Sequence, residues 1–454
     1  MQSFPVSSSI KRFSSRFKDA GFSLFIVGGA IRDHLLGLQN DDYDFTTDAD
    51  PQEVISLFPH VIPTGIDHGT VTVIFENQMF EVTTFRTDGD YVDGRHPSSV
   101  TFIRNLEEDL KRRDFTINAF AVDCSNGNII DKHEGTKDLK NKMIRAIGDP
   151  HLRFSEDALR ILRGCRLASK LNFSIERQTL VAMGELKDNL TFVSKERIRE
   201  EFFKMIGSGQ PSIGLSYMRE TRILEVLFPV LAQGNGIEQK GMHHEDILSH
   251  NISACQAAAD MGFTLEVRLA ALFHDIGKSL TIVEKDGGYT FYQHELVGER
   301  ETKKILSSLK ASNEQIKTVS HLVREHMFNY QETWTDSAVR RFINRVGLSY
   351  LPLLFQLRFA DQKAINGSVD IRMVSELDGR IQGILSEHDA LTVKDLAING
   401  NDLILLGIPK GPSIGKILNL LLETVLDDPK QNTKEQLSDI AKCYQSEFVS
   451  KILS

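Results

Sequence analysis

The fold is decided by a stretch that begins Gly28-Gly29-Ala30-Ile31-Arg32-Asp33 and ends Asp42-Tyr43-Asp44. The apolar run over residues 24–27 predicts a short strand before the two glycines, and residues 30–36 predict a helix after them. Glycines at such a junction present bare backbone N–H groups at a helix N-terminus, where a polyphosphate can bind. Because Arg32 adds a positive charge beside this loop, the stretch predicts a phosphate-binding site.

Two aspartates follow the predicted helix. Asp42 and Asp44 are two residues apart in a β-like run, which would place both carboxylates on one face of a strand. Taken alone, such a pair is more often a solvated acidic turn. Beside a phosphate-binding loop, paired carboxylates are what two-metal phosphoryl transfer needs, with Mg²⁺ as the metal. Glu81, in a later strand-like run, is the candidate for a third catalytic carboxylate.

Composition sets wide bounds on the protein. A chain of 454 residues is long enough for about two to four domains. A net charge of −9 does not exclude an RNA substrate, because a local basic groove can coexist with acidic helices elsewhere. The four cysteines are widely spaced, which is typical of reduced thiols in a cytoplasmic protein, and the lack of an apolar run of about 18 residues predicts no membrane span.

Hydrophobic patterning predicts an α+β multidomain chain. The N-terminal part mixes strand-like runs over 70–75, 80–85 and 116–122 with turns, and a loop is expected over 88–97. From Phe154 onward the pattern is helical. The predicted parts are a head over residues 1–147, a helical neck over 148–235, a third helical domain over 236–370 and a helical tail over 371–454.

Two arginine-bearing motifs complete the candidate site. The first is Arg112-Arg113-Asp114-Phe115-Thr116-Ile117-Asn118-Ala119, whose arginines precede a strand-like run and could grip triphosphate oxygens in bidentate fashion. The second places a carboxylate and three guanidiniums at intervals of three residues, which predicts one helix face. Its members are Asp157, Arg160, Arg163 and Arg166. Alone, each motif is also explained by surface charges that pair with one another.

A carboxylate beside an arginine can select a nucleobase. The carboxylate accepts a hydrogen bond from the amino group of cytosine or adenine, and the guanidinium donates to the neighbouring ring acceptor. Guanine and uracil carry a keto group at that position, so they would leave buried polar groups unpaired. Asp157 and Arg160 therefore predict a preference for CTP and ATP.

Together, these motifs resemble those of class II CCA-adding enzymes, which are tRNA nucleotidyltransferases of the polymerase-β-like superfamily. The resemblance runs from about residue 22 to 230. It implies a polymerase-β-like head with a mixed sheet, an all-α neck, and addition or repair of the 3′-terminal CCA at the acceptor end of tRNA from CTP and ATP. Bacterial poly(A) polymerases share the head, and an enzyme that adds only C or only A would look similar. The segment Asp90 to Pro97 favours full CCA addition because it resembles the flexible loop of the CCA-adding enzymes.

The same resemblance implies roles for individual residues. Asp42 and Asp44 would hold Mg²⁺, and Asp157 and Arg160 would form a protein template for the incoming base. The further nucleotide-binding residues would be Gly28, Gly29, Arg32, Arg113, Arg163 and Arg166. The motif Ser194-Lys195-Glu196-Arg197 with Glu201 resembles the neck element that braces the template helix.

The third domain carries histidines and aspartates that resemble the HD phosphohydrolase superfamily. The resemblance implies a divalent metal on His250, His274, Asp275 and Asp361, with His294 and His326 as ligands of a second metal. Two interpretations stay open at this point. The domain is either a structural helical module with leftover ligands, or an active metal-dependent phosphohydrolase that adds a second activity to the nucleotidyltransferase. An alternative for the whole chain is an HD phosphohydrolase whose head only binds RNA.

Overall fold

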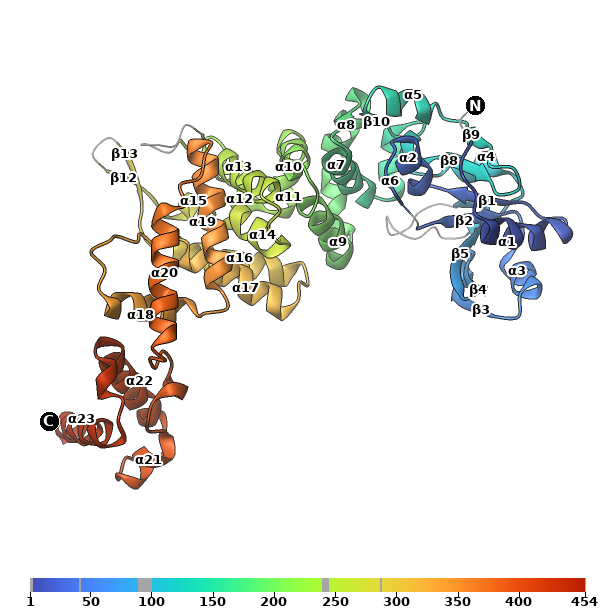
Figure 1. The fold of residues 1–454 in the computed structure, drawn as a ribbon. Coiled ribbons are helices and arrows are strands. Elements are labelled where there is room, and N and C mark those ends of the chain that lie inside the picture. The colour runs from blue at the N-terminus through green and yellow to red at the C-terminus, as the bar shows by residue number, and fades with distance from the viewer. Residues whose placement is uncertain (1–2, 41, 89–99, 239–244, 286–287, 454) are drawn as a thin grey trace.

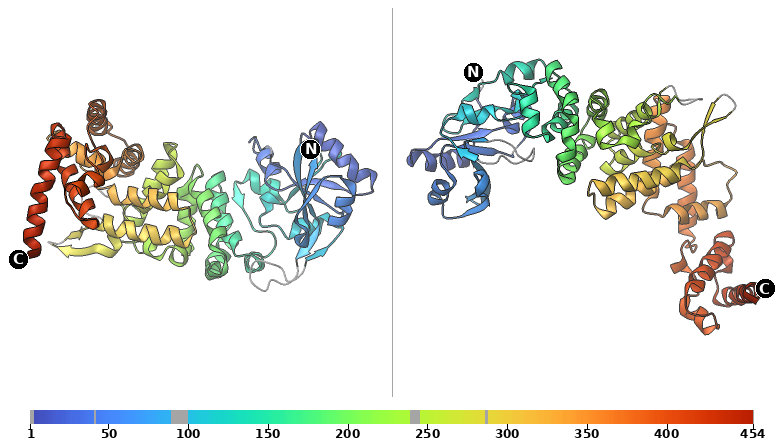
Figure 2. Two further views of the ribbon diagram at one scale, coloured as in Figure 1. Left: turned by 90° about the horizontal axis from the view of Figure 1, so that it is seen from below. Right: turned by 180° about the vertical axis from the view of Figure 1, so that it is seen from behind.

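The structure is a computed structural model that describes residues 3–40, 42–88, 100–238, 245–285 and 288–453. Figure 1 shows an elongated molecule with a sheet-containing head at one end, helical layers in the middle and a helical tail at the other end. The two further views in Figure 2 show the same succession along the chain. The expected α+β fold, with a polymerase-β-like head followed by helical regions, is confirmed.

The head contains a seven-stranded mixed sheet with the strand order β3-β4-β5-β2-β1-β8-β9. Only the pairing between β2 and β5 is parallel within this sheet; the other neighbours are antiparallel. This places the first residue of β2 beside the middle of β5, although the two strands are far apart in sequence. The strands are β1 (Leu24–Val27), β2 (Asp44–Thr47), β3 (Val61–Gly65), β4 (Thr70–Phe75), β5 (Gln78–Thr84), β8 (Phe120–Asp123) and β9 (Ile129–Asp131).

Helix α1 (Ser8–Asp19) covers the sheet through one apolar face. Ile10, Phe13 and Phe17 recur at helical spacing and are all buried. The ring of Phe13 stacks on that of Phe80 from β5 with a centroid separation of 4.5 Å. The remaining head elements are α2 (Gly29–Leu35), α3 (Pro51–Leu57), η1 (Ile66–His68), β6 (Arg86–Asp88), β7 (Val100–Phe102), α4 (Leu106–Lys111), η2 (Thr116–Asn118), α5 (Gly135–Lys140) and β10 (Met143–Ile144).

The apolar run expected over 116–122 divides into the single turn η2 and the strand β8. Local side-chain hydrogen bonds explain the division, because Thr116 Oγ1 donates to Asp138 and Asn118 Nδ2 donates to Asp114. Of the loop expected over 88–97, Asp88 ends strand β6, and residues 89–97 lie outside the described residues.

The neck consists of short helices that pack behind the cavity described below. Its elements are α6 (Pro150–Glu156), α7 (Leu159–Leu171), β11 (Ser174–Ile175), α8 (Arg177–Glu185), η3 (Lys187–Phe192), α9 (Lys195–Ile206), α10 (Pro211–Glu220), α11 (Ile223–Leu227) and α12 (Pro229–Ala232). The expectation that Asp157 shares a helix with Arg160 is wrong. Asp157 has the extended angles φ −143° and ψ 101° and ends α6, while its carboxylate accepts a hydrogen bond from Leu159 N at the start of α7.

In the described part of the remaining chain, the regular elements are helices apart from the two paired strands β12 and β13. The helices are α13 (Ile247–Asp260), α14 (Leu265–Phe273), α15 (Lys278–Thr281), α16 (His294–Ser308), α17 (Asn313–Glu325), α18 (Asp336–Val346), α19 (Leu351–Asn366), α20 (Arg372–Ser386), η4 (Val393–Asp395), α21 (Gly400–Leu405), α22 (Pro412–Asp427), η5 (Pro429–Gln431) and α23 (Lys434–Leu453). Strands β12 (Ile282–Lys285) and β13 (Gly288–Phe291) interrupt the helical pattern expected there, because β-branched and aromatic residues flank a glycine pair. Among the described helices, none is both long and apolar enough to cross a membrane.

Candidate active site

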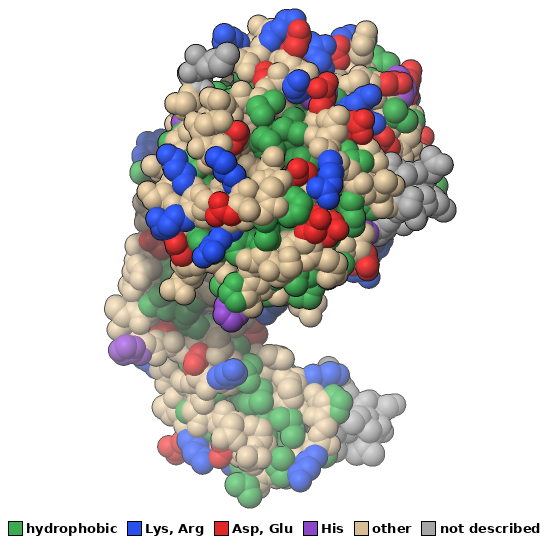
Figure 3. Space-filling model, turned by 90° about the vertical axis from the view of Figure 1, so that its right-hand side faces the viewer, with side chains coloured by type: hydrophobic (Ala, Val, Ile, Leu, Met, Phe, Trp, Pro, Cys, Tyr) green, Lys and Arg blue, Asp and Glu red, His purple; other side chains and the backbone are tan. Residues whose placement is uncertain are grey.

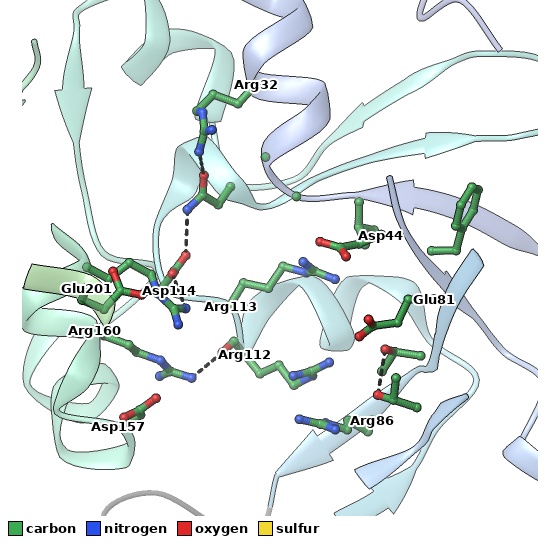
Figure 4. A pocket seen from close by; sticks show the side chains of 18 of the residues that line it. Arg32, Asp44, Glu81, Arg86, Arg112, Arg113, Asp114, Asp157, Arg160 and Glu201 are labelled. Atoms are coloured by element: carbon green, nitrogen blue, oxygen red, sulfur yellow. Dashed lines mark hydrogen bonds and ion pairs between the residues drawn. The ribbon is translucent and has the colours of Figure 1, made fainter. Parts of the chain in front are cut away.

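A cavity of about 660 Å³ opens between the head sheet and the neck helices. Figure 4 shows that carboxylates from the sheet border one end, Asp157 and Arg160 from the neck border the other, and arginines lie between them. Most residues predicted for nucleotide transfer line this cavity, although they come from separate elements. They are Gly28, Gly29, Arg32, Asp44, Glu81, Arg113, Asp157, Arg160, Arg163 and Arg166.

At the sheet end, Asp44 is the first residue of β2 and lies opposite Glu81 of β5 in the parallel register. Asp42 precedes the strand, so the prediction of one strand carrying both aspartates is wrong. The side chain of Asn40 accepts a hydrogen bond from Asp42 N at 3.0 Å and so forms a turn before β2. Asp42 nevertheless lies close enough for its charge to act on both Asp44 and Glu81.

The carboxylates at this end repel one another. Desolvation in the cavity raises the pKa of Asp44, the charge of Asp42 raises it further, and Arg113 opposes the rise. Desolvation and the charges of Asp44 and Asp42 raise the pKa of Glu81 in the same way. A divalent cation would relieve this repulsion, and three carboxylates form a hard oxygen donor set. The residues present therefore fit Mg²⁺.

The diglycine allows the backbone to pass close to two charged side chains. Gly28 has φ +83°, and a Cβ atom there would lie 3.7 Å from Arg113 Nη1 and 3.8 Å from Asp44 Oδ2. Gly29, the first residue of α2, is packed more tightly, because a Cβ atom there would lie 3.2 Å from Arg32 Nη2. The loop predicted as a phosphate site thus reaches the carboxylate end of the cavity.

Arg32 borders the cavity but its guanidinium is held by the protein. Its Nε and Nη2 atoms donate to Asp33 Oδ1 at 2.8 and 2.6 Å, and Nη1 donates to Asn118 Oδ1 at 2.6 Å. Arg32 therefore connects α2 to η2 across the cavity wall.

Arginines occupy the middle of the cavity (Figure 4). Arg113 points toward Asp44, and burial lowers its pKa while the charge of Asp109 opposes the change. Arg112 donates through Nε and Nη2 to Asp109 Oδ1 at 3.0 and 2.8 Å. Arg86 also lines the cavity and was not predicted. Its only signal in the sequence is that it follows the strand-like run that carries Glu81.

At the neck end, separate partners hold the proposed template pair. Asp157 Oδ2 accepts from Arg197 Nη2 at 2.7 Å. Arg160 Nη1 donates to Glu156 Oε2 at 2.5 Å, and its Nη2 donates to the carbonyl of Arg112 at 3.0 Å. The carboxylate and the guanidinium are therefore fixed side by side at the cavity wall, which is the arrangement that can read a base edge.

Two further ion pairs lie behind this pair, one between the neck and the head and one within the neck. Arg163 Nη1 lies 2.9 Å from Asp114 Oδ2, and Arg166 Nε lies 2.5 Å from Glu201 Oε2. Burial disfavours the charge of Arg163, but the carboxylates of Asp114 and Glu201 outweigh burial and raise its pKa. Glu201 and Arg197 belong to the predicted neck motif, whereas the role of Asp114 was missed because its partner is distant in sequence.

A second group of polar residues lies in the helical domain. His250 of α13, His274 and Asp275 after α14, and Asp361 of α19 lie close together. Asp361 Oδ1 lies 3.1 Å from His250 Nε2 and 3.6 Å from His274 Nε2. Asp275 Oδ2 lies 3.3 Å from His274 Nε2. Imidazole and carboxylate atoms therefore converge from three helical segments.

Family models match three parts of the chain. A model of the poly A polymerase head domain matches residues 24–145. A model described as a probable RNA and SrmB-binding site of polymerase A matches residues 172–234. A putative domain 2 of tRNA nucleotidyltransferases matches residues 290–441, a range that spans parts of the third domain and of the tail.

Two relatives that match nearly the whole chain are both CCA-adding enzymes. The chain is 35% identical over 427 residues to a CCA-adding enzyme of Enterococcus faecalis, covering 94% of this chain and 93% of the relative. It is 34% identical over 431 residues to a CCA-adding enzyme of Streptococcus mutans, covering 94% of each. A crystal structure of the Bacillus stearothermophilus CCA-adding enzyme in complex with CTP superimposes with a TM-score of 0.71 at 28% identity, covering 99% of this chain and 100% of that one. These likenesses do not favour a poly(A) polymerase, a partial adding enzyme or a phosphohydrolase.

Proposed function

This chain belongs to the CCA-adding enzymes, a family of tRNA nucleotidyltransferases, and we propose that it adds or repairs the 3′-terminal CCA of tRNA from CTP and ATP. The observation that carries the proposal is the layout of one cavity. Carboxylates stand at its sheet end, arginines in its middle, and the Asp157–Arg160 pair at its neck end. A nucleoside triphosphate calls for all three kinds of group: carboxylates for a metal at the reacting phosphate, arginines for phosphate oxygens, and a hydrogen-bonding pair for the base.

The arginines orient the triphosphate. Arg113 and Arg112 present guanidinium groups between the two ends of the cavity, where phosphate oxygens of a bound nucleotide would lie. Gly28 and Gly29 line the same cavity and leave its wall free of side chains at this point. Arg32 has an indirect role: by holding Asn118 and the first turn of α2 in place, it positions the cavity wall next to the nucleotide.

The carboxylates define the reacting end. Asp42 and Asp44 would hold Mg²⁺, with Glu81 beside them. When bound, magnesium supplies positive charge that favours deprotonation of the tRNA 3′-hydroxyl and offsets the charge that develops on the leaving pyrophosphate. The α-phosphate of a nucleotide whose base lies against Asp157 and Arg160 would lie near these carboxylates, since all of these residues line one cavity.

Base selection follows from hydrogen-bond chemistry at the neck end. The Asp157 carboxylate only accepts hydrogen bonds, so it requires the amino group that cytosine and adenine share. Arg160 only donates, so it requires a ring acceptor beside that amino group. Arg197 and Glu156 hold the two side chains in place, which allows selection by a protein template.

The tRNA would approach from the cavity side and not from the head end. Figure 3 views the molecule from the head end, where Lys and Arg are interspersed with Asp and Glu, as on an ordinary solvated surface. The acceptor end would be held through shape and phosphate contacts, because CCA addition serves tRNAs of different sequence.

Incorporation assays test the proposal. Purified protein is incubated with three tRNA substrates, which lack CCA, end in C or end in CC, and with CTP and ATP separately and together. We expect C, C and A to be added in order and addition to stop at CCA. Absence of incorporation rejects the function, ATP-only extension indicates a poly(A) polymerase, and CTP-only extension indicates a partial adding enzyme.

We also propose that the helical domain binds a divalent metal on His250, His274, Asp275 and Asp361. Two features support it. The Asp361 Oδ1 atom is buried beside two imidazoles, 3.1 Å from His250 Nε2 and 3.6 Å from His274 Nε2. The Nδ1 atom of His274 lies 2.8 Å from the carbonyl of Ala271, so Nδ1 carries the proton and Nε2 turns a lone pair to the cluster. Metal analysis of His274→Ala against the unsubstituted protein tests this site.

A further inference from the structure

A buried carboxylate lies behind the arginines in the middle of the cavity. Asp109 of α4 is fully buried and is not one of the residues that line the cavity. Its Oδ1 atom accepts hydrogen bonds from Arg112 Nε and Nη2 at 3.0 and 2.8 Å. Its Oδ2 atom lies 3.5 Å from Arg113 Nη2. One carboxylate therefore contacts both guanidinium groups that are assigned above to the triphosphate, each through its own oxygen.

Helix α4 is itself fixed to the head sheet. Leu110, the residue after Asp109, is fully buried in a small apolar cluster with Val27 of β1 and Ala121 of β8. Val27 is also the last residue before the diglycine. The Oδ1 atom of Asp109 additionally accepts a hydrogen bond from Arg86 N at 3.3 Å, where β6 begins. The place of the carboxylate is therefore set by the sheet and by the backbone around it.

The C-terminal end of α4 also supports the base-reading end of the cavity. Arg160 Nη2 donates to the carbonyl of Arg112 at 3.0 Å, and Arg153 Nη1 donates to the carbonyl of Lys111 at 3.3 Å. Both contacts are to main-chain oxygens, so they do not depend on the direction of the Arg112 side chain. A change at Asp109 should therefore alter the triphosphate region and leave Arg160 in place.

We propose that Asp109 is a positioning residue, which holds the guanidinium groups of Arg112 and Arg113 in the directions that phosphate oxygens require. This role rests on the proposed function, which assigns the two arginines to the triphosphate. An arginine side chain has several rotatable bonds, so fixing it before the nucleotide arrives lowers the entropic cost of binding. The competing explanation is that Asp109 only neutralises two neighbouring positive charges.

Asp109→Asn distinguishes these explanations. The amide keeps the size of the side chain, but its NH₂ group only donates, so it cannot hold one of the two guanidiniums. Binding of magnesium tripolyphosphate, which has phosphates but no base, is measured by calorimetry on the full chain. We expect its dissociation constant to rise by about 10-fold, because one charge-assisted contact no longer orients an arginine. The dissociation constants of CTP and ATP should rise by one common factor, since Arg160 is unchanged.

Asp138→Asn is the matched control. Asp138 is also buried in a short helix of the head, and it pairs with Arg145 at 3.1 Å, but neither residue lines the cavity. This variant should bind tripolyphosphate as tightly as the unsubstituted protein. Circular dichroism melting curves establish that both variants are fully folded at the temperature of the binding measurement.

The positioning role is overturned if Asp109→Asn binds tripolyphosphate equally or more tightly. Removing a carboxylate that only neutralises charge would leave the phosphate region more positive. Equal weakening in both variants also overturns it, as does an unsubstituted protein that binds no tripolyphosphate. Because the measurement uses neither tRNA nor turnover, its result stands whatever the incorporation assay shows about CCA addition.

A crystal structure of the unsubstituted protein with CTP replaces the binding measurement if Asp109→Asn does not fold. Arg112 and Arg113 that both contact phosphate oxygens while they keep their contacts with Asp109 support the positioning role. Any other arrangement, such as an arginine that leaves Asp109 to reach a phosphate, overturns it.

Discussion

Asp44 and Glu81 are register partners on the parallel strands β2 and β5, so their side chains stand next to each other on one face of the sheet. Strands β2 and β5, which are separated in sequence, thus bring two negative charges together. Asp42 adds to it from the turn before β2. The free protein is therefore expected to lose stability at the place where magnesium would be bound.

Asp44→Asn should make the metal-free protein more stable and less active. The pKa of Asp44 is higher in the folded protein than in the unfolded chain. The folded protein therefore loses stability as the pH rises from the unfolded-state pKa to the folded-state pKa of this carboxyl group. At neutral pH and without metal, the amide should raise the melting temperature by about 1–2 °C, which corresponds to roughly 0.5 kcal/mol for a partly exposed group. Activity should fall by at least about 1,000-fold, because a metal ligand is lost.

The pH dependence provides the control for that experiment. Without metal, the stability gap between Asp44→Asn and the unsubstituted chain should shrink as pH falls toward the ordinary carboxyl range, since Asp44 is then protonated. Magnesium should stabilise only the unsubstituted chain. The groups that face Asp44 are Asp42, Glu81 and Arg113. A variant that melts lower than the parent at neutral pH, or that responds equally to magnesium, would contradict the charge argument.

Arg197→Met should relax nucleotide selection without removing either member of the template pair. Arg197 positions Asp157 through a 2.7 Å hydrogen bond to Oδ2. We expect misincorporation of UTP and GTP relative to CTP to rise by about 10-fold, the effect of roughly 1.4 kcal/mol of lost discrimination. With tRNA, magnesium and CTP present, the rate of pyrophosphate release should not rise, because the reacting end is unchanged.

Arg177→Met is the matched control for this experiment. Arg177 begins α8 in the same neck region, its side chain is 80% exposed, and its nearest carboxylate partner is Glu220 at 3.8 Å. The control should leave selection as it was. If Arg177→Met and Arg197→Met relax selection equally, the effect is a general loss of neck stability and the positioning role is rejected.

The sequence predicted elements whose signal is local. The strands over 24–27 and 70–75 have the predicted bounds, because short apolar or alternating runs stand between turn residues. The break at Asp157 was not predicted, since a run of helix-favouring residues continues through it and only the hydrogen bond to Leu159 N ends α6 there. Local periodicity also gave no sign that β2 would pair in parallel with β5.

In the candidate site too, residues with a local sequence signal were predicted and residues placed by tertiary contacts were not. Residues inside motifs, such as Asp44, Asp157 and Arg160, line the cavity, although Asp157 precedes the helix that carries Arg160. Arg86 was missed, because it is recognisable only from its place in the folded cavity. The guanidinium of Arg32 was expected at the triphosphate, and tertiary packing instead engages it with Asp33 and Asn118.

Gly28→Ala should destabilise the head through backbone strain. Gly28 combines φ +83° with ψ −140°, a region that residues with a Cβ atom rarely occupy, whereas its nearest neighbours lie at ordinary contact distances of 3.7 and 3.8 Å. We expect a loss of about 1–3 kcal/mol in the free energy of unfolding, measured by urea denaturation. Gly379→Ala in α20 is the control, because an ordinary helical glycine in open space should gain about 0.5–1 kcal/mol. Equal shifts of the same sign in both variants would reject the strain argument.

Arg113→Lys should weaken the use of both nucleotides by the same factor. Lysine keeps the charge near Asp44 but loses the planar fork that binds two phosphate oxygens at once. We expect kcat/KM for CTP and for ATP to fall by about 10–100-fold each, the effect of roughly 1.4–2.8 kcal/mol, while the ratio between them stays constant. Arg104→Lys is the control, since Arg104 is 66% exposed and pairs with Glu53 on the outside of the head. If Arg113→Lys changed the CTP-to-ATP ratio, its guanidinium would be contacting the base, and the division of the cavity into a triphosphate region and a base-reading end would be wrong.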